Sequence, residues 1–472
     1  MKERFKSLVL VVLVILNFIL GSRVLSTEKL WSGDGYNFFV SGTNNPITEF
    51  FRNIKLRIQG KSSAETRLEA PELIIINTGD QTSRIAFTSV DTEFATLLEI
   101  ADLFLRSAFS VSQQYTTVST EDFYSALTSK SIYLSYPTDY DAGLFSHLLG
   151  ATRADFSGIF SQLKNIVISA DGYIYIEDSA SDIVYCCHPN VDTTGLNEII
   201  DSQTETVDTD KPIINYAFDL GFDKAFATQK TVLSPMIPIY SSGFELETVS
   251  VSRPLSMLDG TFNETVVSGI LPMFNMNPNS FRRYTEVDGT IVFVENNATL
   301  KISPDGCLEY TAKDNGMSLS NTTLPSSYDT VAAVADFVDT INYSAKSDST
   351  MQLSSKLTST ELSESSFSIT LDYLANGRRV VLNPGNIEPA VSATVTNNRL
   401  VHYKQHMRSF STTVNFMSVD NYIYALDDTI TKFQNQITDI EINELDIIYE
   451  DNFIDEILTP HWNVSVKEIV ID

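Results

Sequence analysis

The sequence predicts an α+β protein that is held at a membrane by a single N-terminal helix. Three observations lead to this prediction. An uncharged apolar run covers 8–20, directly after a basic tip. In the first half, short β-branched runs that end in Gly or Asn turns alternate with helical periodicity. In the second half, a set of strands followed by one helix recurs at a spacing of about 90 residues.

The N-terminal segment predicts the membrane topology. Lys2, Arg4 and Lys6 precede the apolar run, and Arg23 follows it. Since a basic flank stays in the cytoplasm, we expect the N-terminus inside the cell and the bulk of the chain outside. A cleaved signal peptide is the competing interpretation, but the chain near residue 20 matches a small-residue cleavage site poorly. We therefore favour a cytoplasmic tip and a single-pass transmembrane anchor over 1–28.

One polar residue interrupts the apolar segment. Asn17 is the strongly polar side chain between Ser7 and Gly21. An Asn within lipid gains stability by forming a hydrogen bond to another helix. Leu10, Leu13, Asn17 and Gly21 follow helical spacing, and we predict that they face a partner helix. The alternative is that Asn17 lies near the outer membrane interface.

Residues 29–270 are predicted to form an α+β domain, with helices over a largely antiparallel sheet. Strands are expected at 71–76, 84–88, 131–136 and 166–177, the last with a turn at 171–172. Helices are expected at 94–105, with Asp91 as the N-cap, and at 155–164. The acidic segment 188–215 is either a linker or a loop of this domain with a helical turn at 196–200.

The remaining chain is predicted to contain two copies of one unit, over 271–362 and 363–472. Each copy has a hairpin with a Gly turn, a second turn, a strand that ends in Tyr, a loop and one helix. The predicted elements are 291–294, 298–302, 306–310 and 331–341 in the first copy, and 380–382, 390–395, 398–403 and 422–433 in the second. The alternation of apolar and polar residues suits a half-buried antiparallel sheet whose apolar face is covered by the helix.

Composition excludes several classes of partner. With 32 Lys and Arg against 60 Asp and Glu, the formal net charge is −28, which argues against nucleic-acid binding. Outside the cell, the same charge would keep the protein free of anionic wall polymers. The 28 Phe and 20 Tyr are enough to build real cores. Three Cys are too few for a disulfide scaffold, and we expect them to be buried, free thiols.

Motifs of catalysis are missing from the sequence. There is no P-loop, no G-x-G-x-x-G and no G-x-S-x-G. His402 and His406 are four residues apart, but they fall in or beside a predicted strand and lack the Glu of a zincin. We therefore predict a binding or regulatory ectodomain, with no catalytic, metal or cofactor site.

The C-terminal third resembles the YycH/YycI family. The motifs that carry the resemblance lie at 367–373, 376–381, 398–408, 424–426, 444–449 and 458–464. The last of these is similar to the family's Leu-x-Pro-x-Trp-x-Val and contains Trp462. This Trp is either an anchor for a partner or, as we favour, a side chain packed in the final sheet. The length of the chain and the duplicated unit favour the YycH branch, since YycI-like chains are shorter.

The resemblance implies a fold and a function. The duplicated units would be PepSY-like. The protein would be a membrane-anchored accessory regulator in Gram-positive bacteria that contacts a WalK (YycG) type sensor histidine kinase controlling cell-wall metabolism. Its partners would be that kinase, through the anchor helix, and a YycI-like protein. Two other hypotheses remain: an ectodomain that binds a wall fragment or peptide in a groove between the repeats, and a secreted enzyme of unrecognised type.

Overall fold

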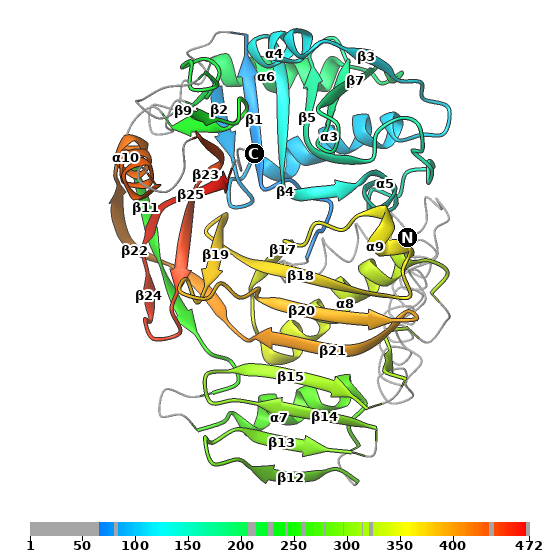
Figure 1. The fold of residues 1–472 in the computed structure, drawn as a ribbon, viewed down its shortest axis with the longest axis vertical. Helices are drawn as coiled ribbons and strands as arrows, with labels where there is room; N and C mark the ends of the chain where they lie inside the picture. Colours follow the sequence, from blue (N-terminus) through cyan, green and yellow to red (C-terminus); the bar gives the residue numbers. More distant parts are fainter. Residues whose placement is uncertain are drawn as a thin grey trace, which may run out of the picture.

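The computed structural model of the chain describes residues 66–79, 84–205, 214–224, 230–240, 244–256, 261–277, 280–295, 297–313, 315–320, 324–433 and 439–468. These residues form eight α-helices and four β-sheets, which confirms the predicted α+β class. Figure 1 shows an upper part, coloured blue to green, and a lower part in which most strands are green to red. The predicted anchor, with Leu10, Leu13, Asn17 and Gly21, lies outside the described residues. No helix in the described ranges is long and apolar enough to span a bilayer.

The upper part is built on a seven-stranded antiparallel sheet with the order β2-β1-β4-β5-β6-β7-β3. Its strands are β1 (Leu73–Thr78), β2 (Arg84–Phe87), β3 (Thr116–Val118), β4 (Lys130–Asp141), β5 (Gln162–Ser169), β6 (Ile174–Asp178) and β7 (Ile183–Cys187). Its helices are α3 (Phe94–Ala108), α4 (Thr120–Thr128), α5 (Ala142–Leu148) and α6 (Thr194–Glu205).

Helices cover both faces of this sheet. Ile74 and Ile76 of β1 belong to one apolar cluster with Phe104 of α3, whereas Ile75 packs in a second cluster with Phe123 of α4. Alternate residues of a strand point to opposite faces, so the continuous apolar run in β1 is buried on both sides. The predicted helical turn at 196–200 is part of α6, which packs against β1, so residues 194–205 belong to the upper part, whereas residues 206–213 lie outside the described residues.

Two local predictions were wrong. The N-cap of α3 is Glu93, not Asp91, because the Asp91 carboxylate accepts a hydrogen bond from the backbone N–H of Thr88 at 2.6 Å. The predicted helix at 155–164 is a loop that runs into β5. Phe156 and Phe160 have helical spacing, but they pack around Phe109 at ring distances of 5.3 and 5.8 Å. Tertiary burial, rather than helical periodicity, explains their positions.

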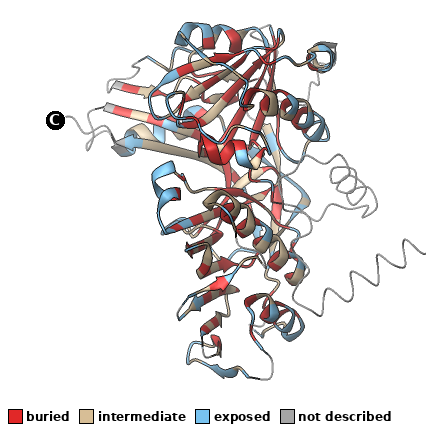
Figure 2. Cartoon of the chain, turned by 90° about the vertical axis from the view of Figure 1, so that its right-hand side faces the viewer, coloured by how far each residue is buried: buried red, intermediate tan, exposed pale blue. Residues whose placement is uncertain are grey.

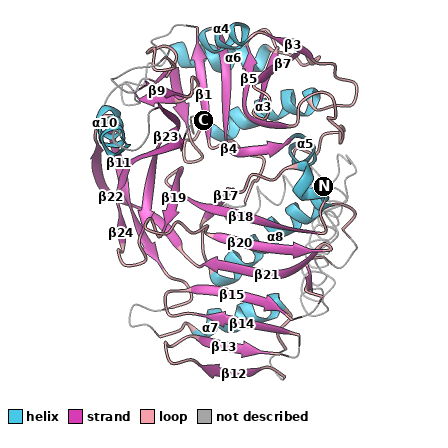
Figure 3. Ribbon diagram, in the orientation of Figure 1, coloured by secondary structure: helices cyan, strands magenta, loops and turns pink. Residues whose placement is uncertain are grey.

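The lower part contains a 13-stranded sheet whose main path is β12-β13-β14-β15-β21-β20-β18-β19-β23-β25. Its strands are β9 (Lys230–Leu233), β12 (Arg282–Thr285), β13 (Ile291–Val294), β14 (Ala298–Ile302), β15 (Cys307–Ala312), β16 (Met317–Ser318), β17 (Thr350–Leu353), β18 (Ser366–Ala375), β19 (Arg378–Leu382), β20 (Val391–Thr396), β21 (Arg399–His406), β23 (Asp439–Asp451) and β25 (Pro460–Glu468). Figure 3 shows these strands in magenta.

Two smaller sheets and four α-helices complete the described residues. The sheet β22-β11-β24 comprises β22 (Ser409–Val419), β11 (Phe244–Ser252) and β24 (Ile457–Leu458), and a second small sheet pairs β10 (Pro238–Tyr240) with β8 (Ile214–Tyr216). The helices are α7 (Glu264–Ile270), α8 (Ser327–Ala345), α9 (Ser359–Ser363) and α10 (Tyr422–Phe433), with a 3₁₀ turn at Leu271–Phe274. In Figure 2 the buried residues, in red, run through the upper sheet and along the elements below it.

The elements expected for the two repeat copies are present, but their packing departs from the expected unit. β15 pairs with β21, so both predicted copies share one sheet. The helix α8 covers β21 of the second copy: Phe337 lies 5.4 Å from Tyr403, and Asn342 accepts a hydrogen bond from Gln405 at 2.8 Å. The helix that ends the first predicted copy therefore packs on strands of the second.

Strand pairing also crosses the predicted domain boundary at residue 270. From within 29–270, β9 pairs in parallel with β23, and β11 pairs antiparallel with β22. Strands from before residue 270 therefore belong to the sheets of the lower part, although most strands of that part come later in the sequence. A division of the chain at 270 remains a proposal about the sequence and does not coincide with a break between sheets.

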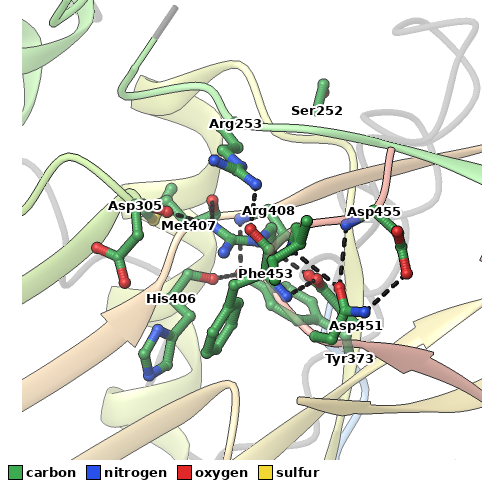
Figure 4. A network of polar contacts seen from close by, with 12 residues as sticks. Ser252, Arg253, Asp305, Tyr373, His406, Met407, Arg408, Asp451, Phe453 and Asp455 are labelled. Carbon is green, nitrogen blue, oxygen red and sulfur yellow. Dashed lines mark hydrogen bonds and ion pairs between the residues drawn. The ribbon is translucent and has the colours of Figure 1, made fainter. Parts of the chain in front are cut away.

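A buried ion pair joins the strands of the lower part (Figure 4). The side chains of Arg408 and Asp451 are 0% and 1% exposed, and Arg408 Nε lies 2.9 Å from Asp451 Oδ2. Arg408 Nη1 also donates to the carbonyl oxygen of Asp305 at 2.7 Å. The guanidinium carbon lies 4.8 Å from the ring centre of Phe453. This cation lies at the junction of β21 and β22, and Asp451 is the last residue of β23.

The backbone of Arg408 is held just as closely. Its N–H donates to the Tyr373 hydroxyl at 3.2 Å, and that hydroxyl donates to the carbonyl oxygen of His406 at 2.7 Å. Ser347 and Ser349 donate to the carbonyl oxygen of Arg408 at 2.7 and 2.8 Å. Segments from β18, β21, β22, β23 and the turn before β15 therefore meet at one buried point.

Replacing Asp451 by Ala should lower the free energy of unfolding by about 3–5 kcal/mol, because Arg408 would stay buried without a counter-charge. Urea denaturation of the full chain in detergent, followed by circular dichroism, measures the change. Asp201→Ala is the matched control, since Asp201 forms an exposed pair with Lys130 and its loss should cost less than about 1 kcal/mol. An equal and small effect of both substitutions would show that the buried pair is unimportant.

Candidate functional site

A cleft lies where the upper sheet meets the lower part. It consists of two adjoining hollows of about 160 and 240 Å³. Both hollows are lined by Pro137 of β4, Lys164 of β5, Arg379 of β19, and Asn443 and Glu444 of β23. In Figure 1, β4 of the upper sheet lies directly above β17 of the lower one. Strands from both parts therefore form the walls of a single cleft.

Strand register places polar side chains on the lower wall. Gln352 of β17 pairs with Asp372 of β18, and Leu374 of β18 pairs with Arg379 of β19. Positions 372 and 374 share a face because side chains alternate along a strand, so Gln352, Asp372 and Arg379 lie on the same side of the sheet. Tyr373, on the opposite side, is fully buried in the core. The face toward the upper part is thus polar, which is unusual for two packed sheets.

Ion pairs connect the two walls. Lys164 Nζ of the upper sheet lies 3.3 Å from Glu444 Oε1 of β23. Arg379 Nη2 lies 3.6 Å from the other Glu444 oxygen and 3.5 Å from Asp446 Oδ2. Glu444 therefore receives one cation from each part of the molecule.

The hairpin between β18 and β19 completes the contact between the two parts. Asn376 and Gly377 have φ angles of 48° and 68°, as a two-residue turn with an Asn-Gly sequence requires. A Cβ atom at position 377 would collide with the side chain of Thr88 in the upper part. Arg378, the next residue, donates to the Tyr240 hydroxyl at 2.9 Å. The close approach of the turn to Thr88 thus requires glycine at 377.

Negative charge slightly exceeds positive charge around the cleft. The carboxylates in its lining are Glu72, Asp139, Asp372, Glu444 and Asp446. The cations are Lys164, Arg378 and Arg379, together with Lys356, which pairs with Asp139 at 2.9 Å. In a chain of net charge −28, this near balance is a local concentration of basic residues.

Burial perturbs two of these acids. It raises the pKa of Glu72 to about 7, with Lys164 offsetting the effect in part. Burial likewise raises the pKa of Asp372 to about 6, partly offset by Arg379. For Lys164, burial lowers the pKa, but Glu444, Glu72 and Asp139 outweigh it and leave the pKa above its ordinary value. Carboxyl groups that titrate near neutral pH in a cleft are a physical reason to suspect a binding site.

The structure places Trp462 of β25 at the edge of this region. Its ring packs against two apolar clusters and lies 6.1 Å from Tyr240, which lines the smaller hollow. Its Nε1 donates to the carbonyl oxygen of Asp420 at 2.6 Å. The side chain is therefore half-buried in the final sheet, and contact with a partner stays a proposal.

The histidines and cysteines lie away from the cleft. His402 and His406 are both in β21, where they face Glu309 at 3.2 Å and Glu388 at 3.0 Å. Within the described residues, no group of three His, Cys, Asp or Glu side chains is arranged to hold a metal ion. Cys186, Cys187 and Cys307 are free, and burial raises the pKa of Cys187 to about 12, which leaves very little reactive thiolate.

The cleft was not predicted from the sequence. Its residues come from eight separate strands, namely β1, β4, β5, β10, β17, β18, β19 and β23, and no motif connects them. The signal in the sequence was weak, because Asp372 of β18 stands between the buried Leu371 and Tyr373, at a polar position of an ordinary alternation. Such a residue marks a polar surface but does not reveal which distant segment faces it.

Glu72→Gln should flatten the dependence of stability on pH between about pH 5 and 8. An acid whose pKa is raised by folding favours the fold below its ordinary pKa of 4.5 and loses this contribution as pH rises through about 7. The charged groups that face Glu72 are Lys164, Arg379, Glu444 and Asp446. The wild-type chain should therefore lose stability across this range, as measured by urea midpoints at each pH. The control Glu364→Gln removes an exposed carboxylate and should leave the dependence of stability on pH as it is in the wild type. The same wild-type dependence in Glu72→Gln would contradict a raised pKa of Glu72.

Comparison with known proteins finds similarity in fold. No family model matches the sequence, and no curated protein matches it. The crystal structure of YycH from Bacillus subtilis is 11% identical with a TM-score of 0.54, and the match covers 87% of this chain and 97% of YycH. An uncharacterized protein from Eubacterium rectale is 10% identical with a TM-score of 0.31, over 52% of this chain and 85% of that one. The chain therefore has a YycH-like fold.

Proposed function

From this YycH-like fold, we propose that the chain is a membrane-anchored extracytoplasmic protein that regulates a WalK (YycG) type sensor histidine kinase. In this proposal the kinase controls cell-wall metabolism in a Gram-positive bacterium. The chain acts by protein–protein contact, together with a YycI-like protein, and neither catalyses a reaction nor takes a cofactor.

The observation that carries the proposal is the extent of the structural match. It covers 87% of this chain and 97% of YycH, so it is a likeness of whole chains rather than of one module. The sequence between 367 and 464 also contains motifs that resemble those of the YycH/YycI family. Fold and motifs therefore lead to the same family of regulators.

The anchor supplies the proposed route to the kinase. A helix over 8–20, preceded by three basic residues, would place the described residues outside the cell. Leu10, Leu13, Asn17 and Gly21 follow one face of that helix, and Asn17 would form the interhelical hydrogen bond. The same proposal includes a PepSY-like fold for the two C-terminal units, 271–362 and 363–472.

An exposed strand offers the proposed contact with the YycI-like protein. β22 pairs only with β11 in the described part of the chain, and its 11 residues carry no charge and no proline. Val414 and Phe416 are 90% and 58% exposed, and Ile423 and Tyr424 of the following α10 are also exposed. An unprotected edge strand with exposed apolar side chains is a template for strand addition by a partner. We assign this edge to the YycI-like protein.

Asn17→Leu should weaken association with the kinase in the membrane. A lost interhelical hydrogen bond of about 0.6–2 kcal/mol corresponds to roughly a 3- to 30-fold decrease in association. Photocrosslinking of the full chain to the kinase, with the probe at position 13, measures it. Ile19→Leu changes the opposite face of the helix and is the matched control. An unchanged yield in Asn17→Leu would remove this contact, and no crosslink at all in the wild type would contradict the proposed function.

Phe416→Lys should reduce co-purification of the YycI-like protein at least about tenfold, because a charge on the edge strand opposes strand addition. Lys at 416 would face Glu247 across β11, so the fold should be preserved. Tyr284→Lys, at a half-exposed aromatic of β12, is the control and should leave the complex intact. Equal recovery of the partner with both variants would exclude β22 as the interface.

A further inference from the structure

The smaller hollow of the cleft has a cation in its lining that no carboxylate contacts. Arg378 of β19 lines this hollow and is half-buried. In the described part of the chain its guanidinium forms no ion pair, and its side chain makes one hydrogen bond, from Nη2 to the Tyr240 hydroxyl at 2.9 Å. Its Nε and Nη1 atoms have no partner there and, unlike Nη2 of Arg408, they remain accessible to solvent. Arg378 therefore keeps N–H donors that a ligand can reach.

The other two cations of this hollow already have carboxylate partners. Lys164 Nζ lies 3.3 Å from Glu444, and Arg379 Nη2 lies 3.6 Å from Glu444 and 3.5 Å from Asp446. Arg378 has instead the ring of Tyr240, whose centre lies 5.4 Å from its guanidinium carbon. An aromatic face attracts a cation but does not replace the oxygen acceptors that a guanidinium takes in a paired site. The group that suits the free donors of Arg378 is therefore an anion.

The charge around the hollow limits that anion to a single negative charge. The lining holds three cations and three carboxyl groups: Lys164, Arg378, Arg379, Glu72, Glu444 and Asp446. Burial raises the pKa of Glu72 to about 7, so this carboxyl is largely protonated below that pH. The three cations then exceed the two remaining carboxylates by one. One added anionic group restores the balance, whereas a second would exceed it.

The remaining lining favours a carboxylate that is attached to an apolar group. A guanidinium binds a carboxylate through two parallel N–H···O hydrogen bonds. Met236, Pro238, Leu374 and Ile447 supply an apolar wall beside the charged residues. A phosphate group would bring a charge of about −1.5 to −2 and would gain little from that wall. The hollow measures about 160 Å³, far more than the roughly 10–15 Å³ that one water molecule needs.

We infer that the smaller hollow binds the carboxylate of a small apolar acid or of a peptide C-terminus, and that Arg378 is the residue that holds it. The ligand enters between the upper and lower parts of the protein, with its carboxylate on Nε and Nη1 of Arg378 and its apolar group on the opposite wall. The site is separate from the anchor helix and from β22, so it stands or falls independently of the kinase proposal.

Binding can be measured with a simple acid on the full chain in detergent at about pH 6. Sodium 3-methylbutanoate should raise the melting temperature in a saturable manner, because a ligand that binds the folded state stabilises it. Sodium chloride at the same ionic strength and the neutral 3-methylbutanamide are the controls, and both should leave the melting temperature unchanged. The absence of a saturable shift with the acid, or an equal shift with either control, would overturn the proposal.

Substitutions at Arg378 test whether this residue holds the ligand. Arg378→Gln can still donate to Tyr240 but lacks the charge, and it should weaken binding of 3-methylbutanoate at least about tenfold. Arg378→Lys keeps the charge without the planar fork and should lose less affinity than Arg378→Gln. Arg282→Gln, at an exposed arginine of β12, is the control and should bind as the wild type does. Wild-type affinity in Arg378→Gln would overturn the proposal.

Glu72 gives the site a pH dependence. The ligand carboxylate is ionised throughout this range, and an ionised Glu72 would repel it, so affinity should fall as pH rises through about 7. The groups that face Glu72 are the charged Lys164, Arg379, Glu444 and Asp446, and the tyrosines Tyr133 and Tyr140 of β4, whose pKa burial raises so that both stay neutral.

Glu72→Gln should remove this dependence and bind 3-methylbutanoate more tightly than the wild type at about pH 8. A gain of affinity cannot result from misfolding, so this variant complements the losses expected at Arg378. An affinity of Glu72→Gln that falls with pH as in the wild type would contradict the charge balance on which the site depends.

Two peptides resolve the source of the carboxylate. N-acetyl-Ala-Ala-Leu with a free C-terminus presents the group on a peptide end, and its C-terminal amide lacks it. Tighter binding by the free peptide than by 3-methylbutanoate assigns the site to peptide C-termini, and binding by 3-methylbutanoate alone assigns it to free small acids. Saturable binding by the peptide amide would contradict carboxylate recognition.

Discussion

The pair formed by Arg408 and Asp451 is the constraint on which the lower part of the molecule depends. Both side chains are removed from water, and each would be strongly unfavourable there without the other. Any packing that separates the end of β23 from the junction of β21 and β22 leaves a buried charge unpaired. The pair also helps to position the walls of the cleft. It holds the end of β23, which carries Glu444 and Asp446, against the end of β21. In the sheet, β21 pairs with β20, and β20 pairs with β18, which carries Asp372.

The proposed activities occupy different places on this frame. The anchor face would act within the membrane, the edge of β22 would bind the proposed YycI-like partner, and the cleft lies between the upper and lower parts. At the proposed location outside the cell, a chain of net charge −28 would be repelled by anionic wall polymers and would remain available for specific contacts. Around the cleft, basic residues nearly balance the acids, and burial raises the pKa of Glu72 to about 7 and that of Asp372 to about 6.

Local structure could be predicted wherever one segment determined it. The apolar run of β1, the periodicity of α8 and the Asn376-Gly377 turn each depend on a few neighbouring residues, and all three were recognised. The failures required distant partners. Asp91 bonds back to Thr88 instead of capping α3, Phe156 and Phe160 follow the shape of a tertiary cluster, and α8 covers β21 because the sheet is continuous there. The cleft was missed for the same reason, since Lys164 and Glu444 are 280 residues apart in sequence and meet only in the folded chain.

The central claim is that this chain changes the activity of a sensor kinase by contact. The most direct measurement is the autophosphorylation rate of the WalK-type kinase in lipid nanodiscs, with and without the full chain at saturating concentration. The account predicts a change in that rate which disappears when residues 1–28 are deleted, because the anchor places the regulator beside the kinase's membrane helices. An identical rate in the presence and absence of the full chain, with both proteins in the same disc, would contradict it.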